Sequence, residues 1–307
     1  MIVIKVPGVH IEGNGATLEA TNDVTSALQI QADGVSLSNL NLTAPREGPR
    51  YSALEQHKLV VNADDVVVRD VSVSGSAAAG VFVLRADNFR LDRISVRGSR
   101  ADGIHMTDGA SNGVVNNAYT ENTGDDGIAV VSYTPTAVGQ YSGTSRNIVV
   151  NSPVVNGTTW GQGVTVRGGE NVTYRDIQVS GTNGAGVFIA SEGAPFFAQS
   201  TRDVNVSGGS ITGANVNPAS AMGAVAVFAE HPGFSAGNIT VSDLTITATP
   251  SSARQNITVL ANGGSVDNVV FRDIRIRQDG ELSAIYSNAP PGSYTATGVT
   301  VNGKPTT

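Results

Sequence analysis

Apolar and polar residues alternate with a period of two in short runs along this chain, and the runs recur. Two phrases account for most of them. The first is apolar-x-apolar-polar-polar-apolar-x-apolar, with copies beginning at Val35, Val66, Phe89, Val172, Ile239 and Val269. The second is Gly-apolar-x-apolar, with copies beginning at Gly80, Gly103, Gly127, Gly163 and Gly186. Such alternation, rich in β-branched residues and bounded by glycine, predicts many short strands joined by tight turns.

The recurrence predicts the architecture. A unit as short as the step from Val66 to Phe89 cannot bury its apolar face alone, so successive units must stack. No 3.6-residue period lies between the strands, which disfavours a solenoid with helices. We therefore expect an all-β, right-handed parallel β-helix that forms a single domain over residues 1–307. A β-sandwich is the alternative, but sandwiches rarely keep one phrase in register over so many units.

An asparagine recurs just before the strand phrases. It is found at Asn88, Asn147, Asn171, Asn238 and Asn268. Asparagine suits turns, and equivalent side chains on stacked units can form a hydrogen-bonded ladder.

The residue before each glycine of the second phrase changes from one repeat to the next. It is, in order, Ala79, Asp102, Asp126, Gln162 and Ala185. Stacked strands lie about 4.8 Å apart, so Asp102, Asp126 and the adjacent Asp125 should gather on one surface. Like charges this close should raise the pKa of at least one carboxyl group. An aspartate that only caps a turn is the alternative, and it explains one such residue better than three.

Asp125 and Asp126 are consecutive, and consecutive side chains of a flat strand point to opposite faces. We therefore expect a bend at which both reach the same groove. Gly124 and Gly127 flank the pair, and we expect them to permit unusual backbone angles.

Side chains after each glycine should alternate between the core and the outside. Val81, Ile104, Ile128, Val164 and Val187 should point inward, and Phe82, His105, Ala129, Thr165 and Phe188 outward. His105 would then lie beside the acids, either as a substrate ligand or as a solvated surface residue. Arg167, also outward, could bind substrate or be an exposed structural arginine.

Four insertions interrupt the repeat, at Ala44–Lys58, Ser132–Arg146, Glu192–Arg202 and Glu230–Ala236. They carry many of the few aromatic residues, including Tyr133 and Tyr141, and the single tryptophan, Trp160, precedes Gln162. Aromatic faces beside acids suit a sugar, although such residues also pack their own loops. The candidate substrate-binding residues are His105, Gln162, Arg167, Tyr133, Trp160 and Glu192.

Composition restricts the classes of partner and of chemistry that suit this protein. The net charge is −7 and no basic patch is present, so nucleic acid is an unsuitable partner. No apolar run is long enough to span a bilayer. The chain has no cysteine, which excludes thiolate metal sites and cysteine nucleophiles. We expect no cofactor and no metal.

Two segments carry a family resemblance. ADGIH (Ala101–His105) and NTGDDGIAV (Asn122–Val130) resemble the polygalacturonase-like hydrolases of the pectin-lyase-like superfamily. The second segment is most similar to the bacterial α-1,3-glucanase and mycodextranase branch. The resemblance implies hydrolysis of a polysaccharide with inversion, Asp125 acting as general acid and Asp102 with Asp126 holding the attacking water.

The chain departs from that family at two places. The family's Gly-His-Gly phrase is replaced by Gly161-Gln162-Gly163, and its Arg-x-Lys clamp for a carboxylate by Phe188-Ile189-Ala190. Loss of the clamp predicts a neutral or weakly charged glycan.

Two other functions stay open. One is a polysaccharide lyase or epimerase on the same fold; the other is a non-catalytic, tailspike-like glycan-binding module. Convergence of the three carboxylates at an open groove would disfavour the non-catalytic module. Proteins of these kinds are expected outside or on the surface of a bacterium or phage, and Met1–Val6 lacks a signal-peptide cleavage pattern. The sequence indicates no oligomeric state.

Overall fold

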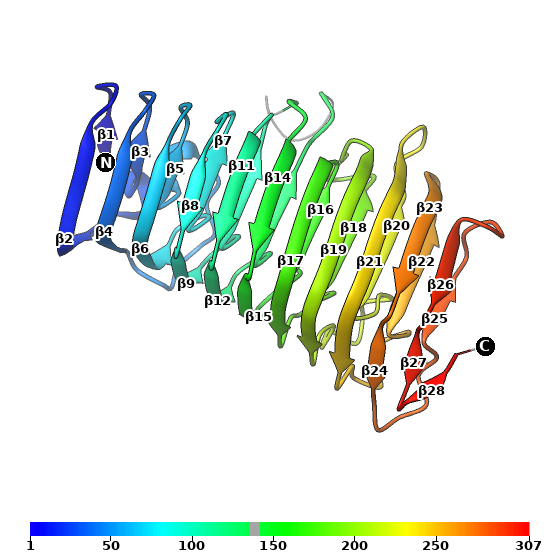
Figure 1. Ribbon diagram of the computed structural model, residues 1–307. Coiled ribbons are helices and arrows are strands. Elements are labelled where there is room, and N and C mark those ends of the chain that lie inside the picture. Colours follow the sequence, from blue (N-terminus) through cyan, green and yellow to red (C-terminus); the bar gives the residue numbers. More distant parts are fainter. Residues whose placement is uncertain (136–141, 307) are drawn as a thin grey trace.

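The chain folds as a parallel β-helix. The computed structural model describes residues 1–135 and 142–306, and its two ends lie at opposite ends of the stack (Figure 1). We call each full turn of the solenoid a coil. Within the two sheets, strands of successive coils pair in parallel; among the strands of the described residues, β28 alone pairs antiparallel, with β27.

In the part of the chain that the structure describes, the smaller sheet has eleven strands, each from the second phrase or its equivalent. They are β1 (Ile2–Ile4), β3 (Leu28–Ile30), β5 (Leu59–Val61), β7 (Val81–Leu84), β10 (Ile104–Thr107), β13 (Ile128–Val131), β16 (Val164–Arg167), β18 (Val187–Ser191), β20 (Val225–Ala229), β22 (Ile257–Ala261) and β25 (Ile285–Ser287).

The larger sheet has seventeen strands and faces the viewer in Figure 1. They are β2 (His10–Glu19), β4 (Ser36–Thr43), β6 (Val67–Ser76), β8 (Arg90–Asp92), β9 (Ser95–Ser99), β11 (Ser111–Asn116), β12 (Tyr119–Thr123), β14 (Arg146–Asn151), β15 (Val154–Thr158), β17 (Glu170–Ser180), β19 (Thr201–Thr212), β21 (Ser235–Thr247), β23 (Ser265–Arg272), β24 (Arg275–Arg277), β26 (Tyr294–Thr297), β27 (Thr300–Val301) and β28 (Lys304–Pro305).

Helical structure among the described residues is limited to two 3-10 turns, η1 (Asp23–Thr25) and η2 (Leu54–Gln56). No helix in the described ranges is long and apolar enough to cross a membrane.

The predicted inward stack is confirmed. Ile104 pairs in register with Val81 and Ile128, and Val164 pairs with Ile128 and Val187. All five side chains are buried. They belong to one continuous apolar core cluster that extends from Ile4 to Val299.

The recurrent Asp and Asn residues have a backbone role. Asp70, Asp176, Asp243 and Asp273 each have a φ of 53–57°, as the left-handed bend of a first-phrase strand requires. Asn and Asp tolerate this conformation better than other non-glycine residues. The asparagine ladder is confirmed: Asn171 donates to Asn147 at 2.8 Å, and Asn147 donates to Asn112 at 3.0 Å.

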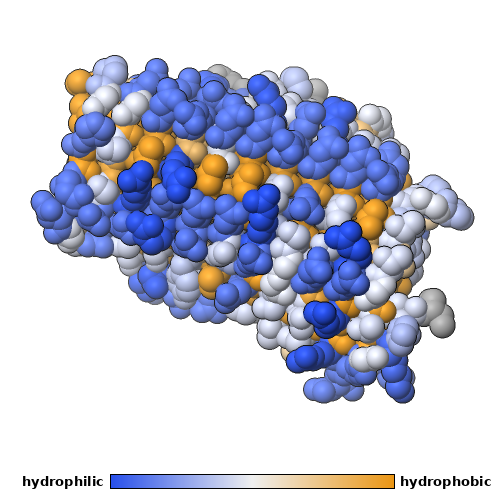
Figure 2. Space-filling model, viewed as in Figure 1, coloured by the Kyte–Doolittle hydropathy of each residue, from blue (hydrophilic) through white to orange (hydrophobic). Residues whose placement is uncertain are grey.

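The two sheets differ in how their outer faces are covered. The larger sheet alternates buried and exposed residues, and its outer face is mainly polar (Figure 2). Strands β10, β13, β16 and β18 of the smaller sheet are buried at every position. The outward residues His105 and Phe188 are only 8% and 0% exposed. A side chain that points outward from the smaller sheet is therefore not necessarily exposed to solvent, because the insertions pack over this sheet.

Candidate active site

The acids lie in a column of equivalent positions, one per coil, at the bend that leads into the smaller sheet. We call it the bend column; each member lies two residues before the first residue paired within the sheet. The six members on the coils around the acids are His57, Ala79, Asp102, Asp126, Gln162 and Ala185. Backbone hydrogen bonds of 2.9–3.1 Å connect each coil to the next at this bend, from Lys58 N to Ala79 O through to Gly163 N to Ala185 O.

The sequence pattern missed one member. His57 occupies the bend column, but Lys58 replaces the glycine that marks the other coils. Only the strand register of β5 with β7 assigns His57 to this position.

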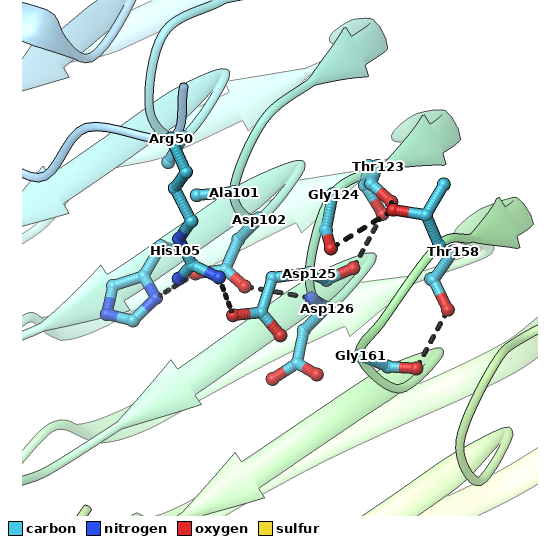
Figure 3. Close-up of polar contacts among 12 residues, drawn as sticks. Arg50, Ala101, Asp102, His105, Thr123, Gly124, Asp125, Asp126, Thr158 and Gly161 are labelled. Atoms are coloured by element: carbon cyan, nitrogen blue, oxygen red, sulfur yellow. Dashed lines mark hydrogen bonds and ion pairs between the residues drawn. The ribbon is translucent and has the colours of Figure 1, made fainter. Parts of the chain in front are cut away.

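The three aspartates converge as predicted. Each offers a carboxylate oxygen, and the three oxygens lie within 4.8 Å of one another (Figure 3). Their side chains meet because the chain bends at Gly124 and Asp125 instead of continuing as a flat strand. Asp102, Asp125 and Asp126 are only 7%, 6% and 2% exposed.

The reason predicted for the flanking glycines is wrong. Neither Gly124 nor Gly127 has a positive φ. Both are needed for close approach instead: a Cβ on Gly124 would lie 2.3 Å from the carbonyl oxygen of Arg100, and one on Gly127 would lie 2.6 Å from Val155. The bend therefore requires absence of a side chain, not freedom of the backbone.

Buried hydroxyl groups hold the bend from inside. Thr123 Oγ1 donates to the backbone carbonyl of Asp125 at 2.8 Å (Figure 3). Ser99 donates likewise to Ala101 at 3.0 Å, and Thr158 to Gly161 at 2.8 Å. These bonds fix the direction in which each coil presents its bend residue.

Two of the aspartates also have a structural hydrogen bond. Asp102 Oδ1 accepts the backbone N–H of Asp126 at 2.9 Å, and Asp126 Oδ1 accepts that of Gln162 at 2.7 Å. His57 Nδ1 accepts the N–H of Ala79 at 3.1 Å in the same way. The turn-capping alternative is thus correct for one oxygen of Asp102 and of Asp126. It does not apply to Asp125, which accepts no backbone N–H among the described residues.

An arginine from a distant insertion completes the cluster. Arg50 Nη1 donates to Asp125 Oδ2 at 2.6 Å, across 75 positions of sequence (Figure 3). Its loop is tied to the coil by buried Arg100, which donates to the carbonyls of Pro45 and Pro49 at 2.9 and 3.0 Å and pairs with Asp23 at 2.8 Å. The insertion Ala44–Lys58 was recognised in the sequence, but nothing in it distinguished Arg50 from a solvated arginine.

The second oxygen of Asp125 has a different environment. Asp125 Oδ1 is buried and has no hydrogen-bond donor among the described residues. Gly161 packs against it, and a Cβ there would lie 2.4 Å away. A buried carboxyl oxygen without a donor is compatible with a proton on that group.

Burial and charge move the three pKa values apart. Burial raises the pKa of Asp126 to about 8, although Arg167 opposes the shift, and the other two aspartates add to it. Burial also raises the pKa of Asp125, as does the charge of Asp102, and Arg50 opposes both. For Asp102 burial acts in the same direction, but His105, Arg50 and Arg167 together hold its pKa below the ordinary value. Asp102 is thus the most readily ionised of the three.

His105 lies beside the acids, as predicted, and it is not solvated. Its Nδ1 is 2.6 Å from Asp102 Oδ2. Its ring stacks on Phe82, with centroids 5.2 Å apart, and Phe82 stacks in turn on His57 at 4.0 Å. The proposed alternative of a solvated surface histidine is wrong, because these rings and the first insertion cover it.

Arg167 is neither exposed nor free to bind an anion. It is 8% exposed, its Nη2 lies 3.5 Å from Asp126 Oδ2, and its Nε lies 3.0 Å from Glu192 Oε2. The rings of Phe188 and Phe196 lie on it, with centroids 5.1 and 5.5 Å from the guanidinium carbon. Arg167 and Glu192 are therefore placed to hold Asp126, and the exposed structural arginine expected as the alternative is wrong.

The other candidate residues are divided. Tyr133 is half-buried at the edge of the cluster and lines the hollow described below. Trp160 is 54% exposed, and its ring centroid lies 6.4 Å from that of Phe196. Gln162 contacts Asp126 through its backbone, while its side-chain amide packs on Gly184 of the next coil.

About half of the aromatic residues in the insertions pack on one another, as the alternative to sugar binding predicted. His231 stacks on Phe234 at 4.1 Å and meets Phe197 edge-on at 5.7 Å. Tyr51, Tyr133 and Phe196 instead line a hollow that borders Asp102. Tyr141 lies outside the described residues.

A hollow of about 390 Å³ adjoins the cluster, within the size range of ligand sites. Asp102 and His105 form its boundary toward the acids. Its other walls include Tyr51, Phe82, Tyr133 and Phe196.

The three aspartates are also the one group of His and acidic residues in the described ranges that could hold a metal ion. Their oxygens suit a hard cation such as calcium, which takes six to eight oxygen ligands. Arg50 and Arg167 already offset the negative charge of Asp125 and Asp126, however, so the donor set does not require a metal.

Comparisons with known proteins agree with this architecture. A family model described as "Right handed beta helix region" matches residues 56–202. The catalytic domain of a GH87 α-1,3-glucanase in complex with tetrasaccharides is 15% identical with a TM-score of 0.56; the match covers 97% of this chain and 61% of that domain. The exopolygalacturonase of Thermotoga maritima is 12% identical, with a TM-score of 0.58 and coverage of 98% and 82%.

A different activity occurs among the similar structures. An alginate lyase from a Paenibacillus species is 14% identical, with a TM-score of 0.51 and coverage of 97% and 90%. No curated protein matches the sequence. At these identities the likeness shows the fold alone: the chain is a right-handed parallel β-helix. It spans about three fifths of the α-1,3-glucanase domain.

Proposed function

We propose that the protein is a glycoside hydrolase that cleaves a polysaccharide, with its active site at Asp102, Asp125 and Asp126. The observation that carries the proposal is the convergence of three carboxylates from two adjacent coils within 4.8 Å, beside a hollow of ligand size. Similar structures that act on glycans support it, including an α-1,3-glucanase and an exopolygalacturonase.

The chemistry requires one protonated acid and one ionised base. Asp125, with a raised pKa, donates its proton to the glycosidic oxygen as the bond to the anomeric carbon breaks. A water attacks that carbon and gives its proton to Asp102, whose pKa is lowered, with Asp126 holding the water. Protons balance: one leaves Asp125, one arrives at Asp102, and two saccharide ends with free hydroxyl groups result.

The stereochemistry follows from the family resemblance and not from the spacing. Carboxyl groups of inverting enzymes are typically roughly 6.5–9.5 Å apart, whereas these carboxylate oxygens lie within 4.8 Å. Proton NMR of the first-formed anomer measures the outcome directly. We propose inversion.

The test is reducing-end release from neutral α-glucans, pectins and bacterial capsular glycans. On the glycan that is cleaved, Asp125→Asn should lower turnover by a factor of about 10² or more, because the proton donor is lost. Asp102→Asn and Asp126→Asn should be severely impaired too. Asp92→Asn is the matched control, since Asp92 is 5% exposed and lies in the larger sheet.

Thermal unfolding of each variant separates chemistry from folding. Near wild-type turnover in all three variants would place the active site elsewhere. Loss of activity only through unfolding would mean that the aspartates are turn caps. Glycan binding without any product would favour the non-catalytic module.

A lyase or epimerase is the second candidate. Arg50 on Asp125 and His105 on Asp102 supply a cation and a second titratable group beside the acids, as proton abstraction next to a uronate carboxylate requires. A lyase would release an unsaturated product that absorbs in the ultraviolet, and an epimerase would change the uronate composition without cutting the chain.

A further inference from the structure

The bend column has a gap on the N-terminal side of the acids. His57 and Asp102 both project large polar side chains from it, two coils apart. Ala79 occupies the coil between them with only a methyl group. Since adjacent strands are about 4.8 Å apart, His57 and Asp102 are separated by about 10 Å at the backbone. The hollow of about 390 Å³ lies over this gap, with His57, Ala79 and Asp102 among its lining.

The walls of the hollow are mainly aromatic. Tyr51 comes from the first insertion, Phe82 from β7, and Tyr133 and Phe196 from the second and third insertions. The residues in its lining with polar side chains are Arg50, Ser52, His57, Asp102 and His105, together with the two tyrosines. Apolar walls with a few directed polar groups are suited to a pyranose, whose C–H faces are apolar and whose rim carries hydroxyl groups.

Charge disfavours an anionic sugar in the hollow. Among the residues that line the hollow, Arg50 is the one guanidinium, and it is bound to Asp125 at 2.6 Å. His57 stays neutral because burial, followed by the nearby His105, lowers its pKa to about 3. Asp102 is ionised at the boundary. A uronate or sulfate placed here would face the Asp102 carboxylate, while the nearby guanidinium of Arg50 is already paired with Asp125. Like-charge repulsion therefore disfavours an anionic sugar.

Aromatic side chains also lie on the other side of the three aspartates. Phe196 lines the hollow and also lies 6.4 Å from Trp160, which belongs to the coil after Asp126 and is 54% exposed. A glycan could therefore extend from the hollow, over the three carboxylates, to Trp160 on the far side.

We propose that the hollow over Ala79 is a subsite for one neutral sugar residue of the substrate, and that the methyl group of Ala79 sets its depth. The position of the reacting bond next to this subsite rests on the proposed function. Arg50 and Tyr51, both from the first insertion, form part of its wall.

The test is equilibrium binding without turnover. Titration calorimetry, and the fluorescence of Trp160, would be followed with three tetrasaccharides in the Asp125→Asn background. Two are neutral, an α-1,3-glucan and an α-1,4-glucan, and the third is tetragalacturonate. We expect at least one neutral tetrasaccharide to bind and tetragalacturonate to bind at least 10-fold more weakly.

Substitution locates the subsite. Ala79→Leu should weaken the neutral tetrasaccharide at least 10-fold by filling the hollow. Ala20→Leu is the matched control, because Ala20 lines a comparable hollow of about 320 Å³ at the N-terminal end, and it should leave binding unchanged. Should Ala79→Leu fail to fold, Tyr51→Ala removes a wall without adding volume and should also weaken binding.

Each result has a definite meaning. Wild-type affinity in folded Ala79→Leu overturns the subsite, as does preference for tetragalacturonate or lack of binding by both neutral probes. Binding that depends on Ala79 in a wild-type protein that cleaves no glycan would keep the subsite and overturn the hydrolase.

Discussion

Asp102, Asp125 and Asp126 differ in what surrounds each carboxylate, although the three are neighbours. Asp102 is held ionised by His105, Asp126 is buried against Arg167, and Asp125 meets Arg50 at the mouth of the site. The environment, and not the residue type, divides the acid and base roles.

The proton on Asp126 should be visible in stability. Its pKa is about 8 in the folded protein and near 3.8 unfolded, so between about pH 4 and 8 the folded state binds more protons. Its contribution is fully present below pH 4 and is lost as pH rises through 8. Asp126→Asn, which keeps an oxygen for Gln162 N–H, removes this dependence. The melting temperature of the variant minus that of wild type should increase from pH 4 to pH 8, and a flat difference would contradict the assignment.

Arg50 should set the upper pH limit of activity. Its charge and hydrogen bond lower the pKa of Asp125, against burial, which raises it. Arg50→Gln should therefore raise that pKa. A general acid must be protonated, so the alkaline limb of the kcat/KM profile should move to higher pH. Arg46→Gln, in the same insertion and bonded to Ser74 at 2.8 Å, should leave the limb in place. A limb that moves down, or does not move, would show that Asp125 is not the acid.

At the scale of elements, the active-site bend depends on a close approach between coils. Gly124 lies against the backbone of Arg100 on the preceding coil, and Thr123 fastens the bend from within. The first contact is between backbone atoms of adjacent coils, and the second fixes the carbonyl of Asp125 to the end of β12. The positions of the active-site side chains are thus set by how adjacent coils stack.

Gly124→Ala should destabilise the protein by about 1–3 kcal/mol, the usual cost of overpacking. The new Cβ would meet Arg100 backbone atoms at 2.3–2.9 Å, which no side-chain rotation can relieve. Chemical denaturation measures the difference. Gly280→Ala is the control, because that glycine has no atom within 4 Å of a Cβ and no positive φ. Equal stability of the two variants would mean that the bend adapts.

At the scale of the whole molecule, one core cluster connects the coils from Ile4 to Val299. In solenoids each unit contacts only its neighbours, so cooperativity depends on the interfaces between units. A core without a break predicts that the chain unfolds as one domain.

Thermal unfolding should accordingly show a single transition. Ile128→Ala, in the middle of the inward stack, should lower the free energy of unfolding by about 2–5 kcal/mol, because it leaves a cavity in the core. The transition should move to lower temperature and stay single. Calorimetry would reveal this, and two resolved transitions in the wild-type protein would indicate two folding units. Val24→Ala, an exposed apolar position, serves as the control.

The sequence by itself determined the coil, its inward stack and the column of acids. A period-two pattern fixes which way each side chain points, and a repeat in register fixes which residues become neighbours on adjacent strands. Those two facts bring Asp102 and Asp126 together. Asp125 joins them because the chain bends at Gly124 and Asp125, a bend that was expected from the consecutive acids and their flanking glycines.

Only the tertiary structure decided what covers that surface. The contact of Arg50 with Asp125 across 75 positions, the ion pairs of Arg167 and the burial of His105 all depend on where the insertions fold back. Insertions carry no repeat, so their residues have no register from which a position can be inferred. His57 was missed for a related reason: Lys58 removed the glycine that marks the bend, and the pairing of β5 with β7 was needed to restore it.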